Sequence, residues 1–191
     1  MKRNLTEEDL TADWHILPNE HELVLSKRDT TWLGFVLLLK FFQLEGRFPA
    51  EPHEIPVEVV RFVALQVGVD PSEWEKYPWK GRSAEYHRAS IRAYLGFRES
   101  TVADAEALEI WLVEEILNHE HRMDRLRETV LDHCRKLHIE PPTQERIRRL
   151  LRSAIQNNEI HFCENIFQRL DSAVPLQKIW SFYKTSEKLH N

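Results

Sequence analysis

The stretch that decides the fold is Arg28–Pro49, RDTTWLGFVLLLKFFQLEGRFP. Its apolar run, Trp32–Leu39, is far shorter than the roughly 20 residues that a membrane span requires, so it predicts a buried core helix. Gly46 suits the left-handed residue that commonly ends a helix. Gly34 costs about 1 kcal/mol relative to alanine inside a helix, and we expect another helix to approach closely there.

The remainder of the 191 residues also favours helices. Glycine occurs only five times, and no run alternates apolar and polar residues over the length of a strand. With 42% hydrophobic residues, six tryptophans and nine phenylalanines, the chain can bury a core. We therefore predict an all-α, multi-helix bundle. The expected lobes are residues 1–99 and 100–174, followed by a tail at 175–191.

Charge is segregated along the chain, although the net charge is only −5. Residues 80–98 hold five basic residues against one acid, and residues 143–152 hold four arginines against one acid. Between them, residues 99–121 hold seven acids and no lysine or arginine. Because a binding face depends on the local field, two basic surfaces are expected despite the negative total.

The first basic segment predicts a helix over residues 82–95, after a turn at Pro78–Gly81. Arg88 and Arg92 are four residues apart and share a face. The apolar positions gather elsewhere, at Ala84, His87, Ile91, Tyr94 and Leu95. We therefore expect the arginine face to be free of the core. Residues 71–95 would then resemble a helix-turn-helix, whose second helix reads a major groove.

The second basic segment repeats this order. A helix is expected over residues 123–137, then a turn at Pro141–Thr143, then a helix over 143–157 that can continue to about Leu170. Arg149 and Arg152 share one stripe of it. A solvated charged face with internal salt bridges is an equally good interpretation of either helix.

Motifs of enzymes and metal sites are missing from the sequence. Ten histidines and two cysteines, Cys134 and Cys163, form neither a C-x-x-C pair nor an HExxH motif, and no phosphate-binding glycine loop occurs. We expect no metal and no cofactor. The cysteines suit a reducing compartment, and the polar, acidic start is not that of a signal peptide.

Three strings carry a resemblance to a known family: TWLGFVLLLKFFQLEGRFP (31–49), EYHRASIRAYLGFR (85–98) and HIEPPTQERIRRLLRSA (138–154). Over roughly residues 1–171 the chain resembles the N-terminal region of Tn-three family transposases of replicative transposons. The resemblance implies a helical region that binds the transposon's terminal inverted repeats. It places catalysis in a distant C-terminal nuclease domain with an acidic metal-binding triad, so we do not expect these 191 residues to be an enzyme.

Charge and resemblance together predict ten DNA-contacting residues: Lys80, Arg82, His87, Arg88, Arg92, Arg98, Arg146, Arg148, Arg149 and Arg152. In this hypothesis Arg88 and Arg92 contact guanine or phosphate, and Lys80, Arg82 and Arg98 hold the backbone. The expected partner is double-stranded DNA of transposon ends in a bacterial cytoplasm, with no membrane. Self-association is left open.

The alternative is a helical protein-interaction module with no nucleic-acid role. Its acidic segment, residues 99–121, would contact a partner, and its basic faces would pair with acids on that partner. The sequence also leaves open the target bases, which arginines read bases, and whether the reading frame is a truncated gene, a remnant or a fragment.

Overall fold

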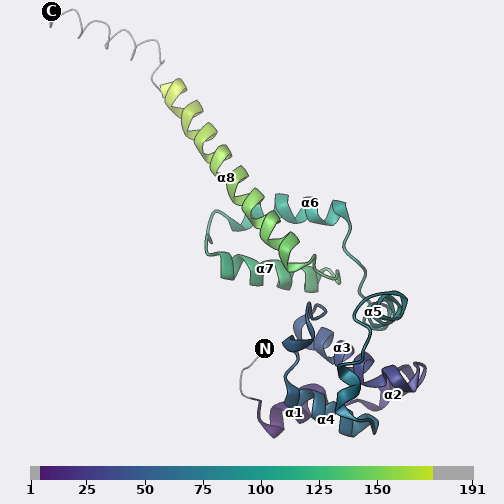
Figure 1. Ribbon diagram of the computed structural model, residues 1–191. Coiled ribbons are helices and arrows are strands. Elements are labelled where there is room, and N and C mark those ends of the chain that lie inside the picture. Colours follow the sequence, from purple (N-terminus) through teal and green to yellow (C-terminus); the bar gives the residue numbers. More distant parts are fainter. Residues whose placement is uncertain (1–4, 174–191) are drawn as a thin grey trace, which may run out of the picture. The chain divides into compact units, whose positions relative to one another are not determined.

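The structure is a computed structural model that describes residues 5–173, and it confirms the all-α, multi-helix prediction (Figure 1). The predicted tail, 175–191, lies outside the described residues. The α-helices are, in order, α1 (Glu7–Trp14), α2 (Pro18–Leu25), α3 (Trp32–Glu45), α4 (Val57–Val67), α5 (Arg82–Leu95), α6 (Val102–Trp111), α7 (Met123–Lys136) and α8 (Gln144–Ala173). Short 3-10 helices occur at η1 (Asp29–Thr31), η2 (Pro52–Glu54) and η3 (Pro71–Trp74), and η4 (Leu112–Ile116) is a π-helical turn.

The chain forms two compact units that are not continuous in sequence. The first comprises Met1–Thr101 and Glu128–Thr143, and the second comprises Val102–Arg127 and Gln144–Asn191. The predicted lobes, by contrast, meet once, near residue 100. The difference is residues 128–143, which join the first unit although they follow the acidic segment.

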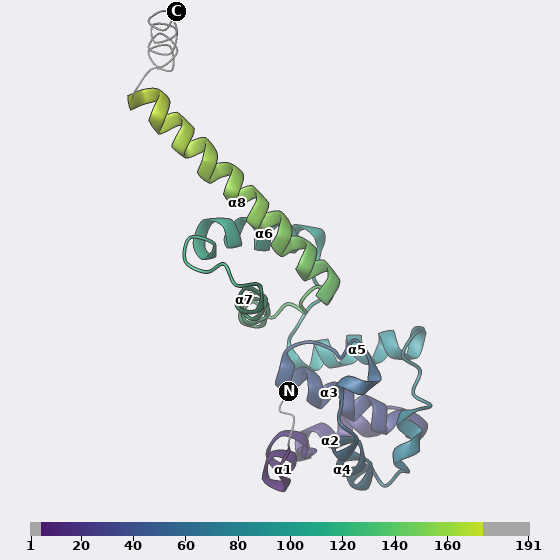
Figure 2. The ribbon, with the colours of Figure 1, turned by 60° about the vertical axis from the view of Figure 1, so that its left-hand side comes forward.

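Helix α3 is the centre of the first unit, as its apolar run predicts. It packs against α1, α2, α4 and α5 (Figure 2), and every residue from Leu33 to Phe42 is buried. Gly46 ends the helix with a left-handed φ of 67°. Helix α3 is therefore the central helix of the first unit, and the other helices of the unit cover it on nearly every side.

Gly34 is explained by a side chain rather than by a neighbouring helix. A Cβ atom at Gly34 would lie 2.0 Å from Cδ2 of the Tyr77 ring. Tyr77 is buried, and its ring stacks on Trp74 with 5.8 Å between ring centroids. The sequence predicts a close approach at Gly34, and the group that makes it is an aromatic ring just after η3 rather than a helix.

One buried ion pair joins α2 to α3. Lys40 Nζ lies 2.7 Å from Glu20 Oε2, and both side chains are almost fully buried. Gln43 Nε2 and the backbone N–H of Leu17 also donate to the Glu20 carboxylate, at 2.7 and 2.8 Å. Burial raises the pKa of Glu20, but these hydrogen bonds and the Lys40 charge outweigh it, so the net pKa is lowered.

Residues 135–140 are attached to the first unit by backbone and side-chain contacts. The N–H of Arg98 donates to His138 O at 3.0 Å, and the N–H of Glu140 donates to Arg98 O at 2.8 Å. Arg135 Nη2 donates to the carbonyl of Leu44 at 2.9 Å, just before Gly46. These contacts place the segment beside the C-terminal end of α5.

The second unit is built on α8, which packs against α6 and η4. Its buried side chains include Leu108, Leu112, Leu117, Ile147, Leu151 and Ala154. In both views the C-terminal half of α8 continues past α6 (Figures 1 and 2). Ile160, Phe162, Ile166 and Phe167 are exposed there.

Candidate nucleic-acid interface

Helix α5 forms where the sequence predicts it. Gly81 precedes its first residue with a φ of 93°, and Gly96 ends it with a left-handed φ of 72°. Ala84, His87 and Ile91 are buried and form the stripe that packs on the first unit. Any contact between α5 and DNA must use the sides of the helix that this stripe leaves exposed.

His87 is a core residue, which corrects its prediction as a DNA contact. It is 4% exposed, and its Nδ1 shares a 2.7 Å hydrogen bond with the Tyr77 hydroxyl. The Phe35 ring meets it edge-on, with 5.2 Å between ring centroids. Burial, with a smaller effect from the Lys27 charge, lowers the pKa of His87 to about 4, so the imidazole is neutral at pH 7.

Arg88 and Arg92 do not form the free basic face that the sequence predicts. The Arg88 guanidinium lies 5.5 Å from the centroid of the Phe48 ring, and its Nε is buried without a hydrogen-bond partner among the described residues. The Arg92 side chain is 16% exposed, and its Nη1 donates to Glu140 Oε2 at 2.5 Å. Both arginines face the first unit's own side chains.

The geometry of the helix explains this correction. At about 100° per residue, Arg88 projects within roughly 60° of Ile91 and roughly 20° of Leu95, inside the apolar arc. Spacing of four residues places Arg88 and Arg92 near each other but does not say which way they face. The spacing of the apolar residues in the sequence therefore already places Arg88 on the core side of the helix.

Glu140 forms the closest ion pair with Arg92. Burial raises the pKa of Glu140, and the hydrogen bond and charge of Arg92 only partly offset this, so the net pKa is raised. Arg92 Nη2 also lies 3.6 Å from Glu99 Oε2. A guanidinium held by two carboxylates from the same unit is not available for phosphate without loss of these contacts.

Three other predicted contacts of the first unit are exposed. Lys80 and Arg82 lie at the start of α5, and Arg98 lies after its end. The backbone of Arg98 pairs with residues 138–140, and its guanidinium Nη1 donates to Glu99 O at 3.2 Å. The N-terminal end of α5 therefore carries two exposed basic groups, Lys80 and Arg82.

Sequence reasoning missed two cations near that end, Lys27 and Arg28. They lie between α2 and η1 and, with Arg82, Ser83 and Tyr86, line one hollow of the first unit. The only signal in the sequence is two adjacent basic residues before the apolar run. Nothing in their spacing links them to residue 82, so only the fold brings them together.

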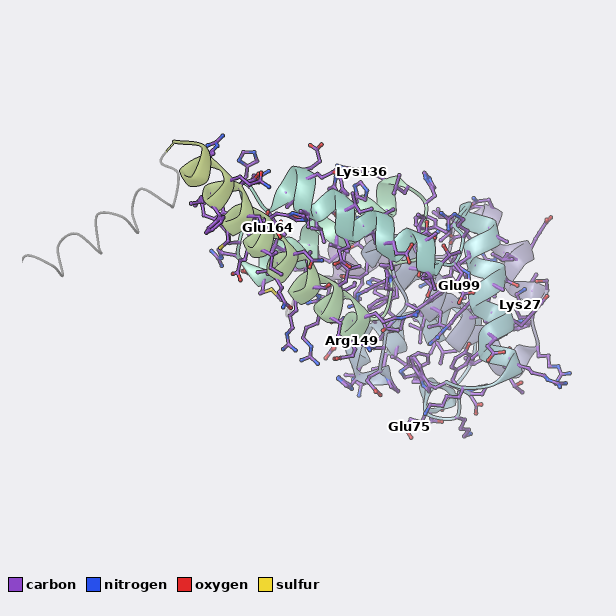
Figure 3. The ribbon with its side chains drawn as sticks, turned by 90° about the horizontal axis from the view of Figure 1, so that it is seen from above. Lys27, Glu75, Glu99, Lys136, Arg149 and Glu164 are labelled. Atoms are coloured by element: carbon purple, nitrogen blue, oxygen red, sulfur yellow. The ribbon has the colours of Figure 1, made fainter. Side chains whose placement is uncertain are left out.

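The four arginines in the first turns of helix α8 lie on its exposed side. Arg146, Arg148, Arg149 and Arg152 are all exposed. Ile147, Leu150, Leu151 and Ala154 are buried on the other side. At about 100° per residue, Arg148, Arg149 and Arg152 lie within an arc of about 100°, centred opposite the buried residues. We call these three residues the α8 arginine face; Arg149 is labelled in Figure 3.

The ion pairs of the α8 arginine face are weak ones. Arg148 Nη2 pairs with Glu145, and Arg149 Nε lies 4.0 Å from the same carboxylate. The arginine side chains are 55% and 68% exposed, so solvent screens these pairs and each contributes little. A phosphate can replace Glu145 at small cost, in contrast to Glu140 at Arg92.

Within residues 5–173 no group of three or more His, Cys, Asp or Glu side chains is arranged to hold a metal ion. Cys134 is buried and Cys163 is exposed, and neither is in a disulfide. No described helix is long and apolar enough to cross a membrane.

Comparison with known proteins places the chain in a family. The family model described as "Domain of unknown function (DUF4158)" matches residues 1–154. The chain belongs to the DUF4158 family. Among curated proteins, the transposase for transposon Tn501 of Pseudomonas aeruginosa is 28% identical over 104 residues, which is 54% of this chain and 10% of that protein. The two findings confirm the resemblance to the N-terminal region of Tn-three family transposases.

The match to the Tn501 transposase is partial on both sides. The DUF4158 chain spans about a tenth of that relative's length. A transposase-related role follows from the two comparisons together. Binding of terminal repeats and the part played by individual arginines do not follow from them.

Proposed function

We propose that this DUF4158 chain binds duplex DNA at transposon terminal inverted repeats, as a non-catalytic N-terminal region of a transposase. The α8 arginine face would make the main contact. The observation that carries the proposal is the exposure of Arg148, Arg149 and Arg152 directly opposite the buried side of α8. The likeness to a transposase supplies the class of partner.

The order of elements also supports this use of α8. The chain runs from α7 through a turn that contains Pro141 and Pro142 into the first turns of α8. Helix-turn-helix proteins place the N-terminal residues of the second helix against the bases and its flanks against phosphates. The first three turns of α8 carry Arg146, Arg148, Arg149 and Arg152, and its exposed apolar residues come later.

The first unit would add backbone contacts. Lys80 and Arg82 are exposed at the start of α5, and they stay in the proposed interface. Arg98 and Arg146 remain proposed as flanking contacts. The proposed interface does not include His87, Arg88 and Arg92, because these residues are buried or held by other side chains.

Fluorescence anisotropy with two labelled duplexes tests the proposal. One carries the inverted repeat flanking the reading frame, and the other has the same composition in scrambled order. We expect preference for the repeat and a loss of at least tenfold in affinity for Arg148→Gln/Arg149→Gln/Arg152→Gln. Equal binding of both duplexes, or none, would reject sequence-specific recognition.

A matched control separates a local effect from loss of charge. Arg61→Gln/Lys76→Gln/Lys136→Gln also removes three exposed cations, all from the first unit. This control should retain affinity within about threefold. If both triple variants weaken equally, the α8 arginine face is not the site.

A further inference from the structure

A basic hollow lies on the first unit, away from the α8 arginine face in sequence. It has a volume of about 350 Å³ and lies between the end of α2 and the start of α5. Three cationic residues line it: Lys27 and Arg28 from the segment between α2 and η1, and Arg82 from the start of α5. Ser26, Ser83 and Tyr86 add hydroxyl groups, and no acid is among the lining residues whose side chains the structure describes.

The described contacts of the Lys27 ammonium are made by a hydroxyl and two aromatic rings rather than by a carboxylate. Its Nζ donates to Ser90 Oγ at 3.0 Å and lies 4.6 Å from the centroid of the Tyr86 ring and 5.0 Å from that of Phe35. Figure 3 labels Lys27 beside α5. Two rings and a hydroxyl fix the ammonium, but its charge is not neutralised by them.

The other two cations, Arg28 and Arg82, are exposed, and no acidic partner of theirs lies among the side chains that the structure describes. Among the described residues, no carboxylate lies within 4.0 Å of Arg28 or Arg82 in an ion pair. Where the first unit does neutralise cations it does so closely, as at Lys40–Glu20 and Arg92–Glu140. At this hollow, by contrast, three cations lie close together without such a pair among the described side chains.

The start of α5 adds donors to the same place. No side chain caps this helix, and a Cβ at Gly81 would meet nothing within 4 Å. The first amide N–H groups of a helix carry partial positive charge and bind anions. Here they supplement three full charges, which are the main attraction.

We propose that this hollow binds one phosphate of the DNA backbone, with Lys27, Arg28 and Arg82 around the phosphate oxygens. The proposal rests on the proposed function, because it takes duplex DNA as the partner. Three cations from two segments of the chain, with serine hydroxyls beside them, can surround the two free oxygens of a phosphodiester with charge-assisted hydrogen bonds. The exposed ring of Tyr86 would pack against the adjoining sugar.

Arg28→Gln/Arg82→Gln tests the hollow in the full chain. Both side chains are exposed, so circular dichroism should show an unchanged fold. We expect affinity for the repeat duplex to fall about tenfold, and the slope of log K against log salt to become shallower by about 1. The control, Arg61→Gln/Lys76→Gln, removes two charges from the same unit and should change neither quantity.

Neutral methylphosphonate substitutions, placed one at a time in the duplex, give a second readout. We expect one position where the substitution weakens the wild-type chain but not the Arg28→Gln/Arg82→Gln variant. If the chain binds the duplex but variant and wild type respond alike at every position, the hollow is not a phosphate site and the proposed function stands. If the wild-type chain binds no duplex, the proposed function fails, and with it the hollow as a DNA contact.

Discussion

At the scale of single residues, the first unit's core depends on a contact between Gly34, Tyr77 and His87. The Tyr77 ring fills the space that a side chain at position 34 would need, and its hydroxyl bonds His87. Burial raises the pKa of Tyr77 and lowers that of His87, so both groups stay neutral. His87, which the sequence predicts as a DNA contact, is part of this packing.

Lowering the pH should destabilise the chain through His87. Because the folded pKa is about 4 and the unfolded value about 6.5, the unfolded state binds more protons between these values. The contribution is complete above pH 6.5 and declines as the pH falls toward 4. Urea unfolding at pH 5 should show wild type losing about 1–2 kcal/mol more, relative to pH 7.5, than His87→Gln. Equal losses would mean that His87 is not neutral and buried.

Gly34→Ala should destabilise the first unit by about 1–3 kcal/mol, because its methyl overlaps the Tyr77 ring. Thermal unfolding measures the loss. In the background of Tyr77→Ala the same methyl should cost far less, since the ring has gone. Additive losses in the double variant would show that Tyr77 is not what excludes a side chain there.

At the scale of elements, two helices with similarly spaced arginines direct these side chains to different surroundings. Helix α5 turns Arg88 and Arg92 toward its own unit, whereas α8 turns Arg148, Arg149 and Arg152 to solvent. The difference lies in where each arginine stands relative to the apolar arc of its helix. Of these two sets of arginines, only those of α8 remain exposed to a partner.

A matched pair of substitutions distinguishes an arginine that stabilises the fold from one that binds DNA. Arg92→Met leaves the largely buried Glu140 without its donor, so it should lower the free energy of unfolding by about 1–3 kcal/mol. Its affinity for the repeat duplex should change by less than about threefold. Arg149→Met should do the reverse, with unchanged stability and clearly weaker binding. A strong binding loss in a stably folded Arg92→Met chain would restore the α5 hypothesis.

The buried pair between α2 and α3 gives another stability test. Lys40→Met should cost about 3–5 kcal/mol in chemical unfolding, because Glu20 is left charged and buried. The double variant Glu20→Gln/Lys40→Met should recover a large part, since glutamine still accepts the hydrogen bond from the Leu17 N–H. No recovery would show that packing of the Lys40 chain, not its charge, is what matters.

Local patterns predicted most elements but not their long-range contacts. Gly81 and Gly96 bracket α5 at the predicted bounds, and the apolar run of α3 forms the core. The backbone hydrogen bonds between Arg98 and residues 138–140 join segments forty residues apart, and no strand pattern in the sequence predicts them. Glu140 reaches Arg92 through that pairing, so the burial of Arg92 could not be read from spacing alone.

At the scale of the whole molecule, the chain combines a negative total charge with local positive surfaces. Each unit carries one: the α8 arginine face in the second, and the hollow of Lys27, Arg28 and Arg82 in the first. Attraction to DNA depends on these local fields more than on the net charge of −5. Binding through them should weaken steeply with salt.

The salt dependence of binding tests this account most directly. The association constant for the repeat duplex is measured by anisotropy from low to physiological salt, for wild type and for Arg148→Gln/Arg149→Gln/Arg152→Gln. We predict a linear fall of log K with log salt for wild type, and a slope that is shallower by about 2–3 in the variant, since each phosphate contact contributes about 0.9. Equal slopes for the two chains, or no wild-type binding at the lowest salt, would contradict the claim that these arginines neutralise DNA phosphates.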